Sequence, residues 1–264
     1  MKKIIIFMLL LFTLCSCKAV EPVDSASTQN TDLYSVDNTG SGWGFKKNKD
    51  APPDIPQEIS DMLKKYDSFY MDTSGKKVLY LTFDEGYENG YTAQILDVLK
   101  EYNVPAAFFV TGSYFDREPE LIKRMVSEGH IVGNHTQNHP NMHRLENPDK
   151  MKEDLKILDD KYYEMFGKRM KYMRPPEGEY SERVLAAAKD AGYKTVFWSF
   201  AYRDWERDVN RGESYAIEQV TPYLHSGAII LLHAVSRDNA EALDDIIKYA
   251  KERGYVFKSL DEIN

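Results

Sequence analysis

VLYLTFDEGYENG, residues 78–90, joins a compact run of β-branched, aromatic and aliphatic residues to two adjacent carboxylates and a glycine-containing turn. The run predicts a buried strand that delivers Asp84 and Glu85 to the rim of a sheet. In sheets of parallel strands the chemistry lies at the carboxyl ends, because the loops there vary while the strands hold position. This stretch alone leaves two interpretations open: the carboxylates are functional, or they only solvate the end of the strand.

The rest of the chain repeats this pattern, because apolar runs alternate with amphipathic stretches. We predict strands at residues 78–83, 106–110, 131–134, 172–174, 195–200, 228–232 and 255–260. We predict the intervening helices at residues 92–102, 119–128, 148–166, 181–191, 215–225 and 239–253. Such a βαβ series requires a parallel sheet covered by helices. We expect an α/β fold closed into a distorted barrel, because every candidate polar residue falls at the carboxyl end of a run.

The N-terminus, MKKIIIFMLLLFTLCSC, has the layout of a secretory signal: two lysines, an apolar run over residues 4–14, then small and thiol residues. The run is too short to span a hydrocarbon layer of about 30 Å. LCSC at residues 14–17 resembles a bacterial lipobox, in which cleavage before the cysteine is coupled to lipid attachment on its thiol. We therefore expect residues 1–17 to be a lipoprotein-type signal peptide. The mature protein would be anchored at Cys17 on the outer face of the cytoplasmic membrane, or secreted if it is cleaved without lipidation.

Two further segments follow the signal. Residues 18–50 are rich in Ser, Thr, Asn, Asp and Gly without sustained periodicity, which predicts an exposed tether. Trp43 and Phe45 interrupt it, and we expect both rings to pack against the body. Residues 51–264 predict a single catalytic domain, which opens with a packing helix at residues 58–70 whose apolar side chains recur at helical spacing.

The composition excludes several classes of function. The net charge is −8, and Lys and Arg do not cluster on any predicted element, so nucleic acid and anionic membrane surfaces are poor partners. We expect a monomer that meets the membrane only through its lipid anchor. Both cysteines lie in the signal segment. The mature body therefore has no thiol nucleophile and no disulfide, and a metal site in it must use His and carboxylate.

Histidines follow the third predicted strand in GNHTQNHPNMH, residues 133–143. His135 and His139 are four residues apart, so on a helical turn they share one face and can bind one ion together with a carboxylate from elsewhere. The same spacing also suits a solvated helix face. His143 continues the spacing but lies beyond Pro140, which makes it a weaker candidate.

Polar residues also end the next three strands. Arg174 precedes two prolines, which would hold a guanidinium stiffly enough to orient a carboxylate, although a surface arginine beside a rigid turn fits equally. Asp204 and Trp205 pair an acid that can tune a histidine with a ring that can wall an apolar pocket. His233 ends a buried run, a place where a lone histidine is more often structural than catalytic.

Together these signals are far stronger than any one of them, because they occur in order at the same end of successive strands. A divalent ion held by two imidazoles and a carboxylate keeps positions open for water and a carbonyl oxygen, which suits hydrolysis of an amide or ester. The conjunction predicts a metal site from Glu85, His135 and His139, a base in Asp84, an orienting Arg174, and an acid pair of His233 with Asp204.

The order TFDEG, HTQNH, RPPEG, DW and LLH resembles the five motifs of the polysaccharide deacetylase family, carbohydrate esterase family four with the NodB-homology fold. TFDEGYENGYT, KKYDSFY and HAVSRDNAEALDD are closer still to its delta-lactam-biosynthetic de-N-acetylase branch. The resemblance runs from about Trp43 to the C-terminus. It implies a distorted (β/α)7 barrel, a divalent metal and removal of N-acetyl groups from a peptidoglycan strand. In this branch the implied substrate is N-acetylmuramic acid, whose freed amine forms the muramic delta-lactam of spore cortex.

The same resemblance implies a role for each site residue. Asp84 is the base that activates water, and Arg174 orients it. Zinc is the first expectation for the metal, with cobalt, nickel or manganese as alternatives. The other implied roles are metal ligation by His135 and His139, acetyl binding by Trp205 with Pro176 and Leu231 beside it, and protonation of the leaving amine by His233, tuned by Asp204.

The chain departs from the family at two of these positions. Glu85 stands where the family has Asp, and Glu177 stands where the family has an aromatic residue. The longer Glu85 side chain can move the ion, ligate it differently or swing away from it. Glu177 adds negative charge near the groove, which favours a sugar with a free amine or disfavours an anionic one.

Three other functions remain open. A glycoside hydrolase needs two carboxylates facing each other at roughly 5 to 9 Å, and neighbours along a strand point to opposite faces. A non-catalytic wall-binding lipoprotein could retain the fold. A third function, within the family, is a deacetylase for N-acetylglucosamine or another polysaccharide.

Overall fold

The computed structural model describes residues 32–263 of the chain. The predicted signal peptide, the predicted anchor at Cys17 and the first part of the predicted tether lie outside these residues. Among the residues that are described, no helix is both long enough and apolar enough to cross a membrane.

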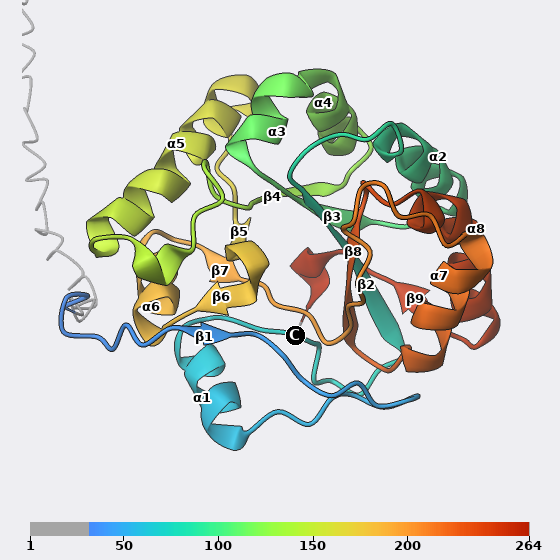
Figure 1. The fold of residues 1–264 in the computed structure, drawn as a ribbon, viewed down its shortest axis with the longest axis horizontal. Helices are drawn as coiled ribbons and strands as arrows, with labels where there is room; N and C mark the ends of the chain where they lie inside the picture. The colour runs from blue at the N-terminus through green and yellow to red at the C-terminus, as the bar shows by residue number, and fades with distance from the viewer. Residues whose placement is uncertain (1–31, 264) are drawn as a thin grey trace, which may run out of the picture. The chain divides into compact units, whose positions relative to one another are not determined.

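A sheet of seven parallel strands forms the centre of the fold (Figure 1). Its order is β7-β5-β4-β3-β2-β8, and β9 pairs with β2. The strands are β2 (Val78–Glu85), β3 (Ala106–Val110), β4 (Ile131–Asn134), β5 (Tyr172–Met173), β7 (Lys194–Thr195), β8 (Ala228–His233) and β9 (Val256–Phe257).

The residues after β7 close this sheet into the predicted distorted barrel. The amide of Ser199 donates to the carbonyl of Ile229 at 3.0 Å, and the amide of Leu231 donates to the carbonyl of Phe200 at 2.9 Å. One segment therefore bonds to β5 at its start and to β8 at its end. The barrel is distorted because this segment has regular strand structure only in the two residues of β7, and β5 is equally short.

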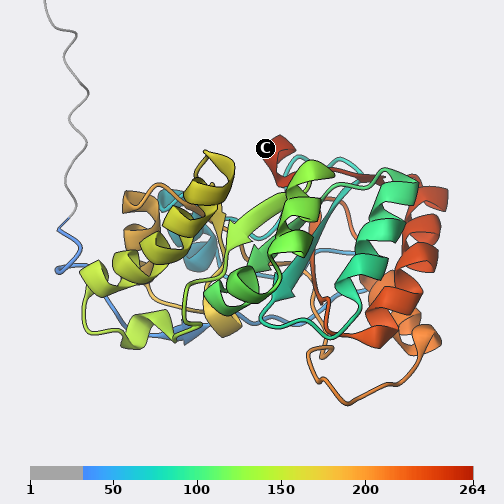
Figure 2. The ribbon, with the colours of Figure 1, turned by 90° about the horizontal axis from the view of Figure 1, so that it is seen from above.

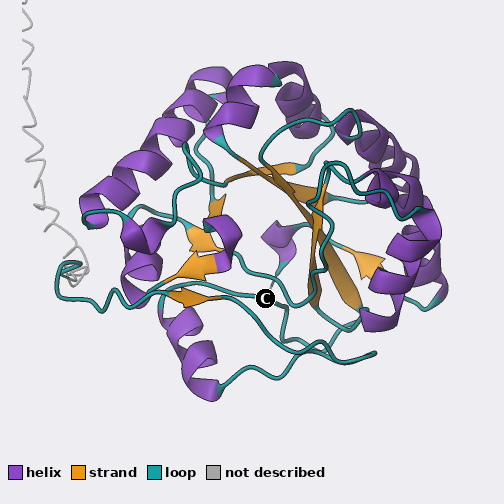
Figure 3. Ribbon diagram, viewed as in Figure 1, coloured by secondary structure: helices purple, strands orange, loops and turns teal. Residues whose placement is uncertain are grey.

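Helices cover the outside of the barrel (Figure 3). Figure 2 shows α4, α2 and α8 running alongside one another. The α-helices are α1 (Gln57–Lys65), α2 (Thr92–Tyr102), α3 (Gly112–Arg117), α4 (Pro119–Ser127), α5 (Pro148–Phe166), α6 (Glu182–Asp190), α7 (Glu213–Val220) and α8 (Arg237–Glu252). Short 3-10 turns are η1 (Met142–Arg144), η2 (Pro176–Gly178), η3 (Thr221–Tyr223) and η4 (Leu260–Glu262).

Several predicted boundaries move for local reasons. The helix at residues 58–70 ends at Lys65, because Phe69 instead pairs with Val196 beside β7. The helix at residues 215–225 becomes α7 followed by η3, which contains Pro222. Helix α3 was not predicted; it starts because the Thr111 hydroxyl accepts the amide of Tyr114.

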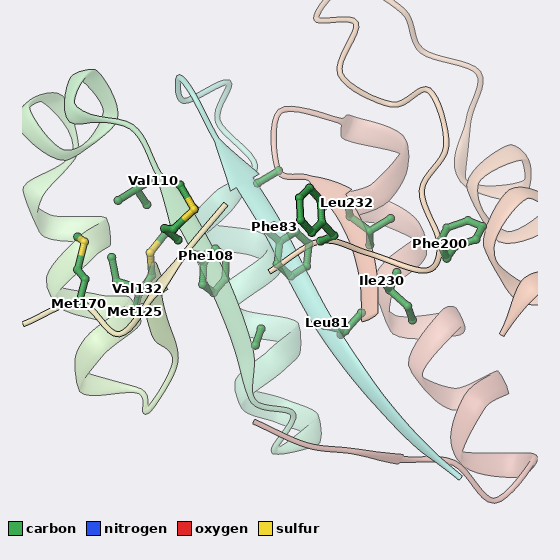
Figure 4. Close-up of a cluster of buried hydrophobic side chains, with 14 of the residues drawn as sticks. Leu81, Phe83, Phe108, Val110, Met125, Val132, Met170, Phe200, Ile230 and Leu232 are labelled. Atoms are coloured by element: carbon green, nitrogen blue, oxygen red, sulfur yellow. The ribbon is translucent and has the colours of Figure 1, made fainter. Parts of the chain in front are cut away.

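The two faces of β2 meet different surroundings. Leu81 and Phe83 belong to the large core between the sheet and the helices, where Phe83 stacks on Phe108 at 5.1 Å between ring centroids (Figure 4). Val78 and Tyr80 belong to the smaller core inside the barrel. Since side chains alternate along a strand, Asp84 shares the barrel-interior face and Glu85 shares the helix face.

The N-terminal strap, residues 32–50, corrects the prediction of an exposed tether over this range. Leu33 and Trp43 are buried, and β1 (Ser41–Gly42) pairs antiparallel with β6 (Glu179–Tyr180). The Trp43 ring lies 4.7 Å from that of Phe197, as its expected packing requires, and its indole N–H donates to the carbonyl of Trp198 at 2.9 Å. A polar composition without periodicity does not reveal such individual anchors.

We expect Trp43→Ala to lower the free energy of unfolding by about 3 to 5 kcal/mol, because it removes a buried ring and leaves a cavity. Urea unfolding followed by circular dichroism measures the change. The matched control is Tyr34→Ala in the same strap, whose side chain is 57% exposed; it should cost less than about 1 kcal/mol. A Trp43→Ala effect as small as the control's would contradict the packed strap.

Candidate active site

A buried ion pair lies at the carboxyl end of the barrel. Arg174, fully buried just after β5, donates from Nη1 to Oδ1 of Asp84 at 2.7 Å and from Nη2 to the hydroxyl of Thr82 at 2.9 Å. Its Nε donates to the carbonyl of Val196 at 3.0 Å. Burial alone would raise the pKa of Asp84, but the guanidinium of Arg174, with the nearby imidazoles, outweighs it and holds that pKa below its ordinary value. Asp84 is therefore an ionised carboxylate although its side chain is largely buried.

His135 presents an unprotonated nitrogen toward this carboxylate. Its Nδ1 lies 2.8 Å from the carbonyl of Arg174, and since a carbonyl only accepts, Nδ1 carries the proton. Its Nε2 lies 3.6 Å from Oδ2 of Asp84. Burial lowers the pKa of His135 to about 4, so the ring is neutral near pH 7 and its Nε2 lone pair is free to bind an ion or accept a proton.

His139 lies next to His135, with ring centroids 5.0 Å apart. The two are not on a helical turn as expected, because Thr136 and His139 have φ of +71° and +54° and the segment is irregular. The carboxylate of Asp154 holds this loop by accepting the amide of Gln137 at 2.7 Å and the side-chain amide of Asn138 at 2.8 Å. The spacing of four therefore brings the rings together through a loop.

Glu85 lies elsewhere. It is fully buried on the helix face of β2, and neither of its carboxylate oxygens has a hydrogen-bond partner among the described residues. Burial, with the nearby charges of Glu88 and Asp84, raises its pKa well above the ordinary value. No three His, Cys, Asp or Glu side chains of residues 32–263 are grouped closely enough to hold a metal ion. The structure brings the two imidazoles together and does not bring Glu85 to them, so the residues present fit a metal as a two-histidine platform only.

A histidine and an acid complete the other side of the site. His233, at the end of β8, is the register partner of Asp84 on β2. Its Nδ1 lies 2.8 Å from Oδ1 of Asp204, and its backbone amide donates to Oδ2 of the same carboxylate at 2.9 Å. Burial alone would lower the pKa of His233, but the Asp204 carboxylate outweighs it and raises that pKa. The Trp205 ring lies 5.7 Å from the imidazole and is half exposed.

These residues surround one cleft of about 1290 Å³. Of the predicted site residues, Asp84, His135, His139, Trp205, Leu231 and His233 line it. Arg174 and Asp204 lie behind them as buried partners, while Pro176 and Glu85 are not among the lining residues. Trp43 and Trp198 also line the cleft and were not predicted to do so. A tryptophan between two glycines in a polar segment was the available signal for Trp43.

We expect Arg174→Met to destabilise the fold by about 3 to 5 kcal/mol, because it leaves Asp84 ionised and unpaired in the interior. Urea unfolding near pH 7 measures the loss. Arg237→Met is the matched control: its partner Glu241, at 2.7 Å, is partly exposed, so the loss should stay within about 1 kcal/mol. Equal losses in the two variants would contradict the importance of the buried pair.

Comparisons with known proteins identify relatives of this arrangement. A family model described as "Polysaccharide deacetylase" matches residues 71–196. An uncharacterised 30.6 kDa protein of Geobacillus stearothermophilus is 48% identical over 97% of this chain and 91% of its own length. Peptidoglycan-N-acetylmuramic acid deacetylase PdaA of Bacillus subtilis is 46% identical over 86% of this chain and 87% of its own length. The solved structure of PdaA, a family 4 carbohydrate esterase, covers 86% of this chain and 98% of that one with a TM-score of 0.83.

Proposed function

The chain belongs to the polysaccharide deacetylase family, and we propose that it hydrolyses the N-acetyl group of N-acetylmuramic acid in peptidoglycan. The observation that carries the reaction type is the register of Asp84 against His233, which sets a carboxylate of low pKa beside an imidazole of raised pKa. Such a pair supplies a base and an acid at one pH. The choice of muramic acid rests on the 46% identity to PdaA. Through its freed amine, which can condense with the neighbouring lactyl carboxylate, the product leads to the muramic delta-lactam of spore cortex.

In this proposal Asp84 removes a proton from water, which attacks the acetyl carbonyl carbon. Arg174 holds Oδ1 of Asp84, so Oδ2 is the oxygen left to take the proton. The His233 imidazolium then gives its Nε2 proton to the amide nitrogen as the C–N bond breaks, and acetate and the sugar amine leave. Asp204 keeps Nδ1 of His233 protonated and so fixes which nitrogen faces the substrate. Trp205 and Leu231 wall the cleft beside the acetyl methyl group.

His135 and His139 are the residues that would hold a divalent ion, zinc first, with cobalt, nickel or manganese as alternatives. An ion bound there would polarise the acetyl carbonyl and stabilise the oxyanion. Two imidazoles without a carboxylate predict weaker binding than a three-ligand site. Export and anchoring at Cys17 belong to the same proposal and are supported by the sequence of residues 1–17. A monomeric state is part of the proposal as well.

Digestion of peptidoglycan, with and without its stem peptides, tests the proposal by mass analysis of the products. We expect loss of acetyl from muramic residues only. Loss of acetyl from glucosamine residues would favour the alternative deacetylase, and new reducing ends would favour a glycoside hydrolase. Binding of glycan without release of acetate, unchanged in Asp84→Asn, would favour a wall-binding lipoprotein.

Asp84→Asn should lower kcat for acetate release by about 10² to 10⁴-fold, because an amide cannot take the proton of water. Acetate release from purified glycan measures the loss. The same preparation is checked by urea unfolding, since the substitution also leaves Arg174 without its counter-charge. A folded variant that retains full activity would exclude Asp84 as the base.

Asp204→Asn should move the alkaline limb of the kcat/KM profile to lower pH by roughly one unit or more. The acid form of His233 is the active one, so activity falls as pH rises through its pKa. Asp204 raises that pKa, and its removal lowers it. Asp208→Asn, an exposed neighbour on the same loop, is the control and should leave the limb in place. An unmoved limb in Asp204→Asn would contradict the tuning.

A further inference from the structure

One wall of the cleft is a face of α3. Ser113, Asp116 and Arg117 all line the cleft, and their spacing of three and four residues places them on one side of the helix. The start of α3 is tied to the catalytic edge twice: the amide of Thr111 donates to the carbonyl of Glu85 at 3.0 Å, and that of Gly112 donates to the carbonyl of Thr136 at 3.1 Å. The helix therefore begins between the strand of Asp84 and the loop of the two imidazoles.

Arg117 is the last residue of α3, and it lines the cleft. A helix of six residues spans only about 9 Å, and helical side chains point toward the N-terminus of their helix. A side chain on the last turn of α3 is therefore directed along the helix toward the end that is tied to the site. Arg117 thus lines the same cleft as Asp84 and His233, into which the sugar that carries the amide must enter.

The guanidinium of Arg117 has no ion-pair partner among the described residues, although Glu88 and Glu118 line a neighbouring pocket with it. Among residues 32–263, Arg117 and Arg144 are the arginines whose guanidinium groups have no hydrogen bond, ion pair or aromatic partner. The neighbouring carboxylate of Asp116 is held by Lys161 at 2.7 and 2.8 Å. The other arginine that lines the cleft, Arg203, is paired with Glu206 at 2.8 Å.

An anionic substrate needs such a cation here. The chain carries a net charge of −8, and Glu177, exposed on η2 with φ of +58°, adds an unpaired carboxylate to the same cleft. Muramic acid differs from glucosamine by a lactyl ether on C3, next to the C2 acetamido group. Its carboxylate thus enters the cleft together with the amide to be cleaved. A planar guanidinium can bind it through two parallel hydrogen bonds.

We infer that Arg117 binds the lactyl carboxylate of muramic acid and is the residue that selects muramic acid over glucosamine. The inference rests on the proposed function. Arg117 touches the substrate away from the reacting amide, so it acts on substrate binding and leaves the chemical step unchanged.

The test compares two glycan tetrasaccharides that differ only in the muramic lactyl group, one with a free carboxylate and one with the neutral carboxamide. Arg117→Gln should lower kcat/KM on the free carboxylate by roughly ten-fold, through KM, because a charge-assisted hydrogen bond is lost. The loss on the carboxamide substrate should be clearly smaller, because a neutral amide oxygen accepts a weaker hydrogen bond from the guanidinium. Arg117→Lys should recover part of the loss, because an ammonium group keeps the positive charge but cannot make the two parallel hydrogen bonds of a guanidinium. Arg144→Gln, which removes the same charge outside the cleft, should match the wild type on both substrates.

Any other result overturns the role of Arg117, the proposed function or both. An equal loss on both substrates, or no loss on either, overturns the role of Arg117 and leaves the proposed function intact. If wild-type enzyme releases acetate from glucosamine units only, the proposed function fails and the inference fails with it. A preference for the free carboxylate that survives in Arg117→Gln would assign the selection to another residue and also overturns the inference.

Discussion

The buried pair of Arg174 and Asp84 is the interaction on which the site depends. Arg174 follows β5, and its guanidinium reaches β2 through Asp84 and the segment after β7 through Val196. Thr82 extends the network by accepting from Arg174 and donating to the carbonyl of Ile230 on β8. Removing two charges from water is costly, and it is tolerated only where hydrogen bonds satisfy both groups. Here β2 and the segment after β7 supply the partners of Arg174, so the orientation of the base depends on strand segments that also form the wall of the barrel.

Much of the fold could be predicted from the sequence, because the alternation of apolar runs and amphipathic stretches reports local periodicity directly. The helix at residues 148–166 has the predicted bounds, and the parallel order follows from the βαβ series. Packing between distant segments left no such periodic signal. Closure through Ser199 and Phe200 and the anchoring of the strap by Trp43 each depend on partners more than 25 residues away.

The site shows the same division. Asp84, Arg174 and His233 meet as predicted, because each lies at the carboxyl end of a parallel strand at one edge of the sheet. Asp204 reaches His233 from the irregular segment that follows Phe200. Glu85 does not join the two imidazoles, and the reason was available in the sequence: side chains alternate along a strand, so a residue next to an inward-facing Asp84 faces the helices. That alternation argued against Asp84 and Glu85 as a glycosidase pair, and it applies equally to Glu85 as a ligand beside His135. A motif match names positions, but it does not state which way each side chain points.

The register of Asp84 against His233 fixes the distance between the backbones that carry the base and the acid. Adjacent strands lie about 4.8 Å apart, so the gap between the two backbones that carry these side chains is set by the hydrogen-bond spacing of the sheet itself, and no loop sets it. The loops around the cleft can then lengthen, shorten or change charge without altering that gap. Loop changes can therefore alter which sugar binds in the cleft without disturbing the residues that cleave the amide.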